Sequence, residues 1–196
     1  MHDEFFAGGF SGLPILAIVQ PRSVQQVVAE CTAAWDKGIR LVEMAMRGPM
    51  AIDMLQAAVA AGRERGMPVG AGTILNKAAM DAVFFAGAAF AVSPGLDLEL
   101  VRHAQRNNGR YLPGVSTPTE IQLALGAGCR WLKAFPAQSL GPHWFDAMRG
   151  PFADAQLVAT GGVTTATARA LLDSGAAGLG VGGALPEVAE LLATGG

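Results

Sequence analysis

One lysine of this chain stands where its amine can act as a nucleophile. The sequence has three lysines, and two of them fall at a predicted helix end and a predicted helix start, Lys37 and Lys77. Lys133 lies instead inside the apolar run 131–134, where an ammonium group is costly to bury. Burial of an amine favours its neutral form, which attacks a carbonyl carbon to make an imine. The position predicts a Schiff-base lysine, and a salt-bridged lysine at a strand end is the alternative.

A carboxylate occupies a similar position earlier in the chain. Glu43 is a charged residue set among the apolar residues of the run 41–46. A buried glutamate of this kind serves as a general acid or base, or it forms a structural ion pair with a lysine, and the residues alone leave both open. Arg47, four residues later, has a guanidinium fork that can grip a carboxylate through two hydrogen bonds.

Glycine pairs follow the last two apolar runs. Thr160-Gly161-Gly162 comes after residues 157–159, and Gly182-Gly183 comes after residues 179–181. Backbone N–H groups in such loops bind phosphate at the carboxyl end of barrel strands. The two pairs together predict an anionic substrate, with ordinary turn glycines as the alternative.

Other polar residues specify less. Thr73 and Pro94 lie in segments that end the third and fourth apolar runs, and neither segment points to a reaction. His103 and His143 lie among helical residues without partners at metal-ligand spacing, so we expect no metal site and no cofactor.

Eight short apolar runs would position these groups. They are nearly continuously apolar, which is typical of parallel strands covered by helices. The runs are residues 13–19, 41–46, 69–71, 90–92, 111–112, 131–134, 157–159 and 179–181.

Segments with helical periodicity lie between these runs. Thr117, Pro118 and Glu120 form an N-cap, a first-turn proline and a capping-box glutamate. Several of the segments end on a glycine that is predicted to cap the helix, at Gly38, Gly66, Gly87, Gly126 and Gly175.

The alternation of strand and helix predicts an α/β fold, a compact (β/α)₈ TIM barrel that forms a single domain over residues 1–196. An open doubly wound sheet is the structural alternative. It lacks support because the loop after the first run, Gln20-Pro21-Arg22-Ser23, carries no glycine-rich dinucleotide motif. In a barrel, the polar residues at the carboxyl ends of the strands would meet in one active site.

Composition excludes several classes of function. The chain is 51% hydrophobic and 15% charged with a net charge of −2, which argues against a nucleic-acid partner. Its longest uncharged stretch is too short to span a membrane. Cys31 and Cys129 are far apart, and the acidic start does not resemble a signal peptide, so we expect a cytoplasmic protein.

The motifs, taken together and in order, closely resemble the family of 2-keto-3-deoxy-6-phosphogluconate (KDPG) and 4-hydroxy-2-oxoglutarate (KHG) aldolases. The resemblance runs from about Leu13 to Gly183. It is carried by Glu43 with Arg47, Gly70-Ala71-Gly72-Thr73, Ser93-Pro94-Gly95, Pro113-Gly114-Val115-Ser116-Thr117, Leu132-Lys133-Ala134-Phe135-Pro136 and Thr160-Gly161-Gly162-Val163.

The resemblance implies a metal-free class I aldolase, usually a homotrimer, that acts on a small 2-keto acid. It makes Lys133 the imine-forming residue and Glu43 the acid/base. Arg47 and Thr73 would hold the substrate carboxylate, and Pro94 would also line the binding site. Phe135 would pack against the three-carbon unit. The phosphorylated end would lie among Thr160, Gly161, Gly162, Gly182 and Gly183.

Departures from the family pattern bear on the substrate. Ala184 stands where KDPG-cleaving members commonly have serine, which removes a hydroxyl contact to phosphate. Gln20 stands where many relatives have arginine, with Arg22 as a substitute two residues on. Thr160 favours the gluconate over the galactonate epimer, because members acting on the latter tend to be apolar there.

Three alternatives stay open at this point. The same chemistry could act on KHG or on 2-keto-3-deoxy-6-phosphogalactonate. Another phosphate-binding barrel, such as a thiamine-phosphate synthase or a ribulose-phosphate epimerase relative, would use the glycine pairs equally well but would not need Lys133. A non-catalytic barrel that binds a phosphorylated metabolite would need neither Lys133 nor Glu43.

Overall fold

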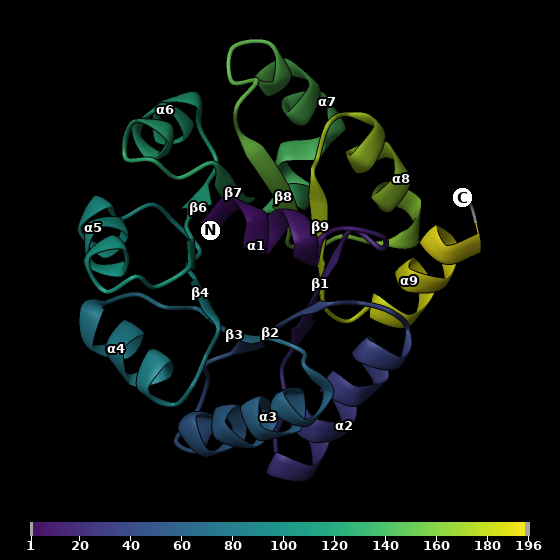
Figure 1. Ribbon diagram of the computed structural model, residues 1–196. Coiled ribbons are helices and arrows are strands. Elements are labelled where there is room, and N and C mark those ends of the chain that lie inside the picture. Colours follow the sequence, from purple (N-terminus) through teal and green to yellow (C-terminus); the bar gives the residue numbers. More distant parts are fainter. Residues whose placement is uncertain (1, 195–196) are drawn as a thin grey trace.

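The computed structural model describes residues 2–194 and contains a barrel of parallel strands inside a ring of helices (Figure 1). The sheet has nine strands in the order β5-β4-β3-β2-β1-β9-β8-β7-β6. They are β1 (Ile15–Val19), β2 (Leu41–Ala45), β3 (Val69–Gly72), β4 (Phe90–Val92), β5 (Tyr111–Leu112), β6 (Gly114–Val115), β7 (Trp131–Ala134), β8 (Gln156–Thr160) and β9 (Gly178–Val181).

The two end members of this order, β5 and β6, are consecutive in the chain and are separated only by Pro113. β5 pairs with β4 and β6 pairs with β7, so the two short strands share one position in the barrel. Proline has no N–H to donate, which explains why the strand is divided there. The eight predicted strand positions and the (β/α)₈ barrel are therefore confirmed.

Nine helices are present in the described part of the chain, and all but the first cover the outer face of the barrel (Figure 1). They are α1 (His2–Gly9), α2 (Val24–Asp36), α3 (Ala51–Arg65), α4 (Lys77–Phe85), α5 (Leu98–Arg106), α6 (Pro118–Gly126), α7 (Ala137–Arg149), α8 (Thr165–Asp173) and α9 (Leu185–Thr194). Within residues 2–194 no helix is long and apolar enough to cross a bilayer.

Most of the predicted helix ends are confirmed. Thr117 caps α6, and its hydroxyl and Glu120 form the expected capping box. Gly38, Gly66, Gly87 and Gly175 all have positive φ, as a glycine after a helix requires. The prediction for Gly126 is wrong, because α6 runs through this residue.

The turn that follows α6 places its positive φ at Gly128 instead. The choice between two glycines that are two positions apart depends on where the chain must turn into β7. Local sequence does not determine that point.

The barrel interior and the barrel surface have separate apolar clusters. The larger cluster fills the space between the sheet and the helices. The smaller cluster lies inside the barrel and consists of Phe6, Phe10, Leu16, Leu41, Phe90, Val92, Leu112, Trp131 and Val158.

Helix α1 does not join the outer ring but lies across one end of the barrel (Figure 1). Its Phe6 is fully buried against Phe90. Phe10, one residue beyond the helix, stacks on Trp131 with ring centroids 5.1 Å apart. Phe90 and Trp131 are the first residues of β4 and β7, so α1 closes the amino-terminal end of the barrel. The carboxyl ends of the strands face the opposite way.

The predicted domain, residues 1–196, includes Met1, Gly195 and Gly196, which lie outside the described residues.

Candidate active site

A cavity of about 330 Å³ opens at the carboxyl ends of the strands. Every residue that the sequence predicted for the site lines it, so the structure brings the predicted set together. These residues are Glu43, Arg47, Thr73, Pro94, Lys133, Phe135, Thr160, Gly161, Gly162, Gly182 and Gly183.

Lys133 and Glu43 meet near the floor of this cavity. Glu43 lies on β2 and Lys133 on β7, and both side chains point into the barrel. The Lys133 Nζ lies 3.6 Å from Glu43 Oε1, and the two side chains are 8% and 2% exposed. The other carboxylate oxygen, Oε2, is buried and has no hydrogen-bond partner among residues 2–194. An acceptor of this kind is rare in a folded interior and is available to a bound molecule.

The barrel wall makes room for the Glu43 side chain at Gly72. Gly72 is the last residue of β3, which pairs with β2. A Cβ atom on Gly72 would coincide with the Glu43 carboxylate. Glycine is therefore required at this position for the carboxylate to keep its place beside Lys133.

Burial governs the protonation of Glu43. Loss of solvent raises the pKa of the Glu43 carboxyl above its ordinary value of 4.5, and the charge and hydrogen bond of Lys133 only partly offset this effect. A carboxyl with a raised pKa returns a proton more readily than an ordinary glutamate does, which suits a group that must both accept and donate.

An aromatic wall lies beside the amine. Phe135 follows β7 directly, and its ring centroid is 5.3 Å from Lys133 Nζ. The peptide bond from Phe135 to Pro136 is cis. Gly161 packs closely against the same ring: a Cβ atom on this residue would lie only 2.9 Å from the ring edge. The amine thus has a flat apolar surface on one side, suited to a small carbon skeleton.

Arg47 and Thr73 lie at the ends of adjacent strands. The backbone N–H of Met46 donates to the Gly72 carbonyl at 3.1 Å, which holds these strand ends together. The Arg47 side chain is exposed at the rim. Thr73 has a φ of 65°, which a β-branched residue rarely adopts. This pair supplies a guanidinium and a hydroxyl to the same side of the cavity.

The opposite side of the cavity is built from the glycine pairs. Thr160 is buried at the end of β8, and its hydroxyl donates to the Val158 carbonyl at 3.2 Å. Gly161 and Gly162 both have positive φ, at 94° and 74°. Gly182 and Gly183 follow β9 and lead into the first turn of α9, which begins at Leu185. Exposed backbone N–H groups and a helix start on this side suit an anion.

The cavity also has lining residues that the sequence did not predict. Three of them lie on a strand, two residues from a position that faces into the barrel, so alternation along the strands identifies them once the inward face is known. The additional residues are Ile18, Gln20, Ala45, Val163 and Gly180.

Arg22 does not line this cavity. It lines a neighbouring cavity of about 510 Å³, which shares Gln20, Ala45 and Arg47 with the candidate site. If Arg22 replaces the arginine that relatives have at the position of Gln20, its guanidinium therefore lies in the neighbouring cavity and not in the candidate site.

His103 forms a side-chain contact at the protein surface. His103 Nε2 lies 2.6 Å from the exposed carboxylate of Asp81. Within residues 2–194 no three His, Cys, Asp or Glu side chains gather in an arrangement that would hold a metal ion.

Comparisons with known proteins agree with this geometry. The family model described as KDPG and KHG aldolase matches residues 10–194. The 2-dehydro-3-deoxy-6-phosphogalactonate aldolase of Escherichia coli K12 is 32% identical over 171 residues, which cover 87% of this chain and 83% of the relative. The KHG/KDPG aldolase of the same organism is 32% identical, covering 80% of this chain and 73% of the relative.

A solved structure supports the same conclusion. The KDPG aldolase of Legionella pneumophila, crystallised with pyruvate captured as a covalent carbinolamine intermediate, superimposes with a TM-score of 0.82 at 27% identity. The match covers 95% of this chain and 96% of that one. The chain described here belongs to the KDPG and KHG aldolase family, whose members are carbon–carbon lyases.

Proposed function

We propose that this aldolase cleaves KDPG into pyruvate and glyceraldehyde 3-phosphate, with Lys133 as the Schiff-base nucleophile and Glu43 as the acid/base. The pairing of the two side chains inside the cavity is the observation that carries the proposal. The amine lies 3.6 Å from a carboxylate that still has an unpartnered oxygen. A structural ion pair alone would gain nothing from leaving that oxygen unbonded.

Imine formation is the first step. The Lys133 amine attacks the C2 carbonyl of the keto acid, and the carbonyl oxygen leaves as water after proton transfer. The resulting protonated imine is an electron sink one atom away from C3, which lowers the barrier to breaking the C3–C4 bond. The shielded position of Lys133, next to the Phe135 ring, keeps bulk water away from this intermediate.

Carbon–carbon cleavage is the second step. Glu43, as the carboxylate, removes the proton of the C4 hydroxyl, directly or through a water, while the electrons of the C3–C4 bond move toward the imine nitrogen. The aldehyde leaves, and an enamine remains on Lys133. Protonation at C3 and hydrolysis of the imine then release pyruvate and regenerate the amine. Acid/base assistance of this kind accelerates a step by about 10²- to 10⁴-fold.

The remaining lining residues orient the substrate. In this proposal the keto acid's carboxylate lies on the side of Arg47 and Thr73, and the phosphate lies against Gly161, Gly162, Gly182 and Gly183. Among the residues that line this cavity, the basic side chains are those of Arg47 and Lys133. Since Lys133 is the nucleophile, the phosphate depends on backbone N–H groups and on the start of α9.

The choice of substrate within the family is part of the proposal. The same chemistry applies to KHG and to the phosphogalactonate epimer. Ala184 gives the phosphate side no hydroxyl, and a hydrogen bond to a charged group contributes about 1.5 to 3 kcal/mol. We therefore expect the preference for KDPG over KHG to be smaller than in a relative with serine at this position.

The test is a coupled assay of pyruvate release. KDPG, its galactonate epimer and KHG are supplied separately, pyruvate is reduced by lactate dehydrogenase, and kcat/KM is compared with and without a chelator. We expect activity on KDPG that survives chelation and that is lost in Lys133→Ala. Lys77→Ala is the matched control, because Lys77 is exposed and paired with Glu99 on the surface.

Trapping the intermediate checks the nucleophile independently. Borohydride with pyruvate should inactivate the wild type and add one reduced pyruvate unit to the peptide that contains Lys133. Activity that persists in Lys133→Ala would overturn the mechanism. Activity on KHG but not on KDPG would overturn only the substrate assignment.

Two properties of the whole protein are also proposed. The family resemblance supports a homotrimer, to be checked by light scattering of the purified protein. Cys31 and Cys129 are both free and buried, which supports a reducing compartment such as the cytoplasm. Fractionation of the native cells would test that location.

A further inference from the structure

A buried tyrosine outside the cavity is bonded to the turn that supplies Pro94. Tyr111 lies on β5 and is 2% exposed, and its ring belongs to the apolar layer between the barrel and the helices. Its hydroxyl donates to Ser93 Oγ at 2.6 Å. Ser93, which follows β4, is also 2% exposed and directly precedes Pro94.

The hydrogen bond from Tyr111 continues into the turn. Ser93 Oγ donates in its turn to the Gly95 carbonyl at 2.7 Å, which closes a short loop around Pro94. The backbone N–H of Gly114 points at the same two acceptors, at 3.4 Å from Ser93 Oγ and 3.3 Å from the Gly95 oxygen. Residues of β5 and β6 therefore form hydrogen bonds with both ends of the turn, Ser93 and Gly95.

This position is also the neighbour of the strand that carries the amine. Gly114 pairs with Lys133 in the β6–β7 register, and the Lys133 N–H donates to the Pro113 carbonyl at 2.8 Å. A Cβ atom on Gly114 would collide with the Pro94 carbonyl. The turn thus rests directly on the backbone beside Lys133, and its placement fixes Pro94 relative to the strand that carries the amine.

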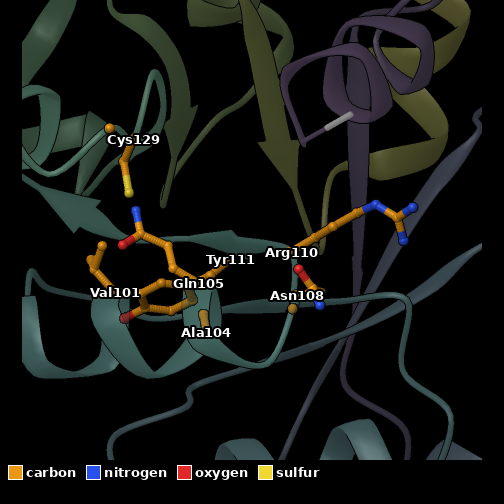
Figure 2. Close-up of a pocket in the computed structure, with 9 residues that line it drawn as sticks. Val101, Ala104, Gln105, Asn108, Arg110, Tyr111 and Cys129 are labelled. Atoms are coloured by element: carbon orange, nitrogen blue, oxygen red, sulfur yellow. The ribbon is translucent and has the colours of Figure 1, made fainter.

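The phenol is suited to donate. Burial raises the pKa of Tyr111 to about 12, so the hydroxyl keeps its proton at neutral pH. The ring lines a separate cavity of about 290 Å³ between α5 and the start of β7, with Val101 and Ala104 on one side and Cys129 on the other (Figure 2). Removal of the hydroxyl would leave this ring packing in place.

We propose that Tyr111 is a positioning residue for the reaction, which acts through Ser93 to hold Pro94 against the substrate carbons bound to Lys133. The inference rests on the proposed function, because it needs the substrate to be attached to Lys133. Tyr111 itself is not one of the residues that line the cavity. Its effect is therefore on the geometry of turnover rather than on substrate capture.

Kinetics of Tyr111→Phe test the proposal. We expect kcat for KDPG cleavage to fall by about tenfold with KM within about twofold, since a misplaced wall slows a reaction more than it weakens capture by Arg47. Ser93→Ala should have a similar effect. The double variant should be no slower than Ser93→Ala alone, because both changes interrupt one chain of hydrogen bonds.

Cys129→Ala is the matched control. It alters the same cavity but leaves the hydroxyl chain intact, so its kcat per folded molecule should equal that of the wild type. Wild-type kcat in Tyr111→Phe, equal losses in Tyr111→Phe and Cys129→Ala, or losses that multiply in the double variant would each overturn the inference. Absence of pyruvate from the wild type would instead overturn the proposed function.

A spectroscopic measurement covers the case in which Ser93→Ala does not fold. Tyr111 is the only tyrosine of the chain, so protein carrying ¹³C at the tyrosine Cζ gives a single resonance. Reductive trapping of pyruvate on Lys133 should shift that resonance if the hydroxyl senses the turn. An unchanged resonance after complete trapping would overturn the proposal.

Discussion

At the scale of single residues, Glu43 as the proposed acid/base should give the reaction its pH dependence. Because burial raises the pKa of its carboxyl, the carboxylate that removes a proton forms at higher pH than for an ordinary glutamate. We expect the acidic limb of the kcat/KM profile to lie above 4.5 and to disappear in Glu43→Gln. That variant should lose about 10²- to 10⁴-fold in kcat. An unchanged limb in Glu43→Gln would contradict this assignment.

The same shift makes the stability of the protein depend on pH. The carboxyl of Glu43 ionises at lower pH in the unfolded chain than in the folded one, so the folded state binds more protons between the two values. The contribution of Glu43 to the free energy of unfolding is therefore fully present below 4.5 and is lost as pH rises through the folded pKa. Urea unfolding across this range should show the wild type losing stability relative to Glu43→Gln as pH rises, because the neutral glutamine does not titrate.

Thr73 combines strain with a place in the site. Its left-handed backbone costs a β-branched residue about 1 to 2 kcal/mol. Thr73→Asn should therefore raise the free energy of unfolding by about 1 kcal/mol, because asparagine tolerates this conformation. It should also raise KM, since the hydroxyl in the cavity is replaced. Urea unfolding and steady-state kinetics on the same preparation measure both effects.

Asn108 offers the reverse experiment. It also has a positive φ, of 53°, and it lies away from the cavity. Asn108→Thr should lose about 1 kcal/mol of stability with unchanged kcat/KM. A rise of KM in Asn108→Thr as large as that in Thr73→Asn would contradict the assignment of the KM effect to the Thr73 hydroxyl.

At the scale of elements, the contact between β2 and β3 holds Glu43, the proposed acid/base, in place. Gly72→Ala should displace the Glu43 carboxylate and lower kcat by about 100-fold or more, with about 1 to 3 kcal/mol of destabilisation from overpacking. Gly70→Ala is the control on the same strand, because its Cβ would meet the Phe90 ring rather than Glu43. It should destabilise the fold similarly while each folded molecule keeps its activity.

The sequence predicted the strands well because barrel strands are short, apolar and bounded by polar residues. The catalytic candidates Lys133 and Glu43 were visible as charges inside such runs, and their pairing followed from the barrel. The division at Pro113 was not predicted, since it depends on which neighbours each half of the strand pairs with. Gly141 interrupts α7 with a φ of 71° just before Pro142, and this was missed as well.

Roles that depend on side-chain distances also escaped the sequence. Tyr111 is an ordinary aromatic residue in a short strand, and nothing in its neighbours indicates a hydroxyl bonded to a turn 18 residues earlier. The lining by Ile18, Ala45 and Gly180 required knowing which face of each strand points inward. The family resemblance could not supply these points, because it is carried by other positions.

At the scale of the whole molecule, α1 stabilises the barrel from the end opposite the site. Phe6→Ala should cost about 3 to 5 kcal/mol, because the fully buried ring contacts the interior cluster. Phe85→Ala is the control, since that ring is 94% exposed, and it should change stability by no more than about 0.5 kcal/mol. Urea unfolding compares the two. A loss in Phe85→Ala as large as in Phe6→Ala would show that burial does not determine the effect.

The closure of the barrel by α1 has a kinetic consequence. With the amino-terminal end filled by Phe6 and Phe10, reactants and products pass through the mouth that Arg47 borders. In the proposed mechanism pyruvate stays tethered to Lys133 on the floor of the cavity, while the aldehyde lies nearer the exit. The aldehyde therefore departs first and pyruvate last. Product inhibition should show this sequence: pyruvate competes with the keto acid for the free enzyme, and glyceraldehyde 3-phosphate inhibits noncompetitively by reversing cleavage.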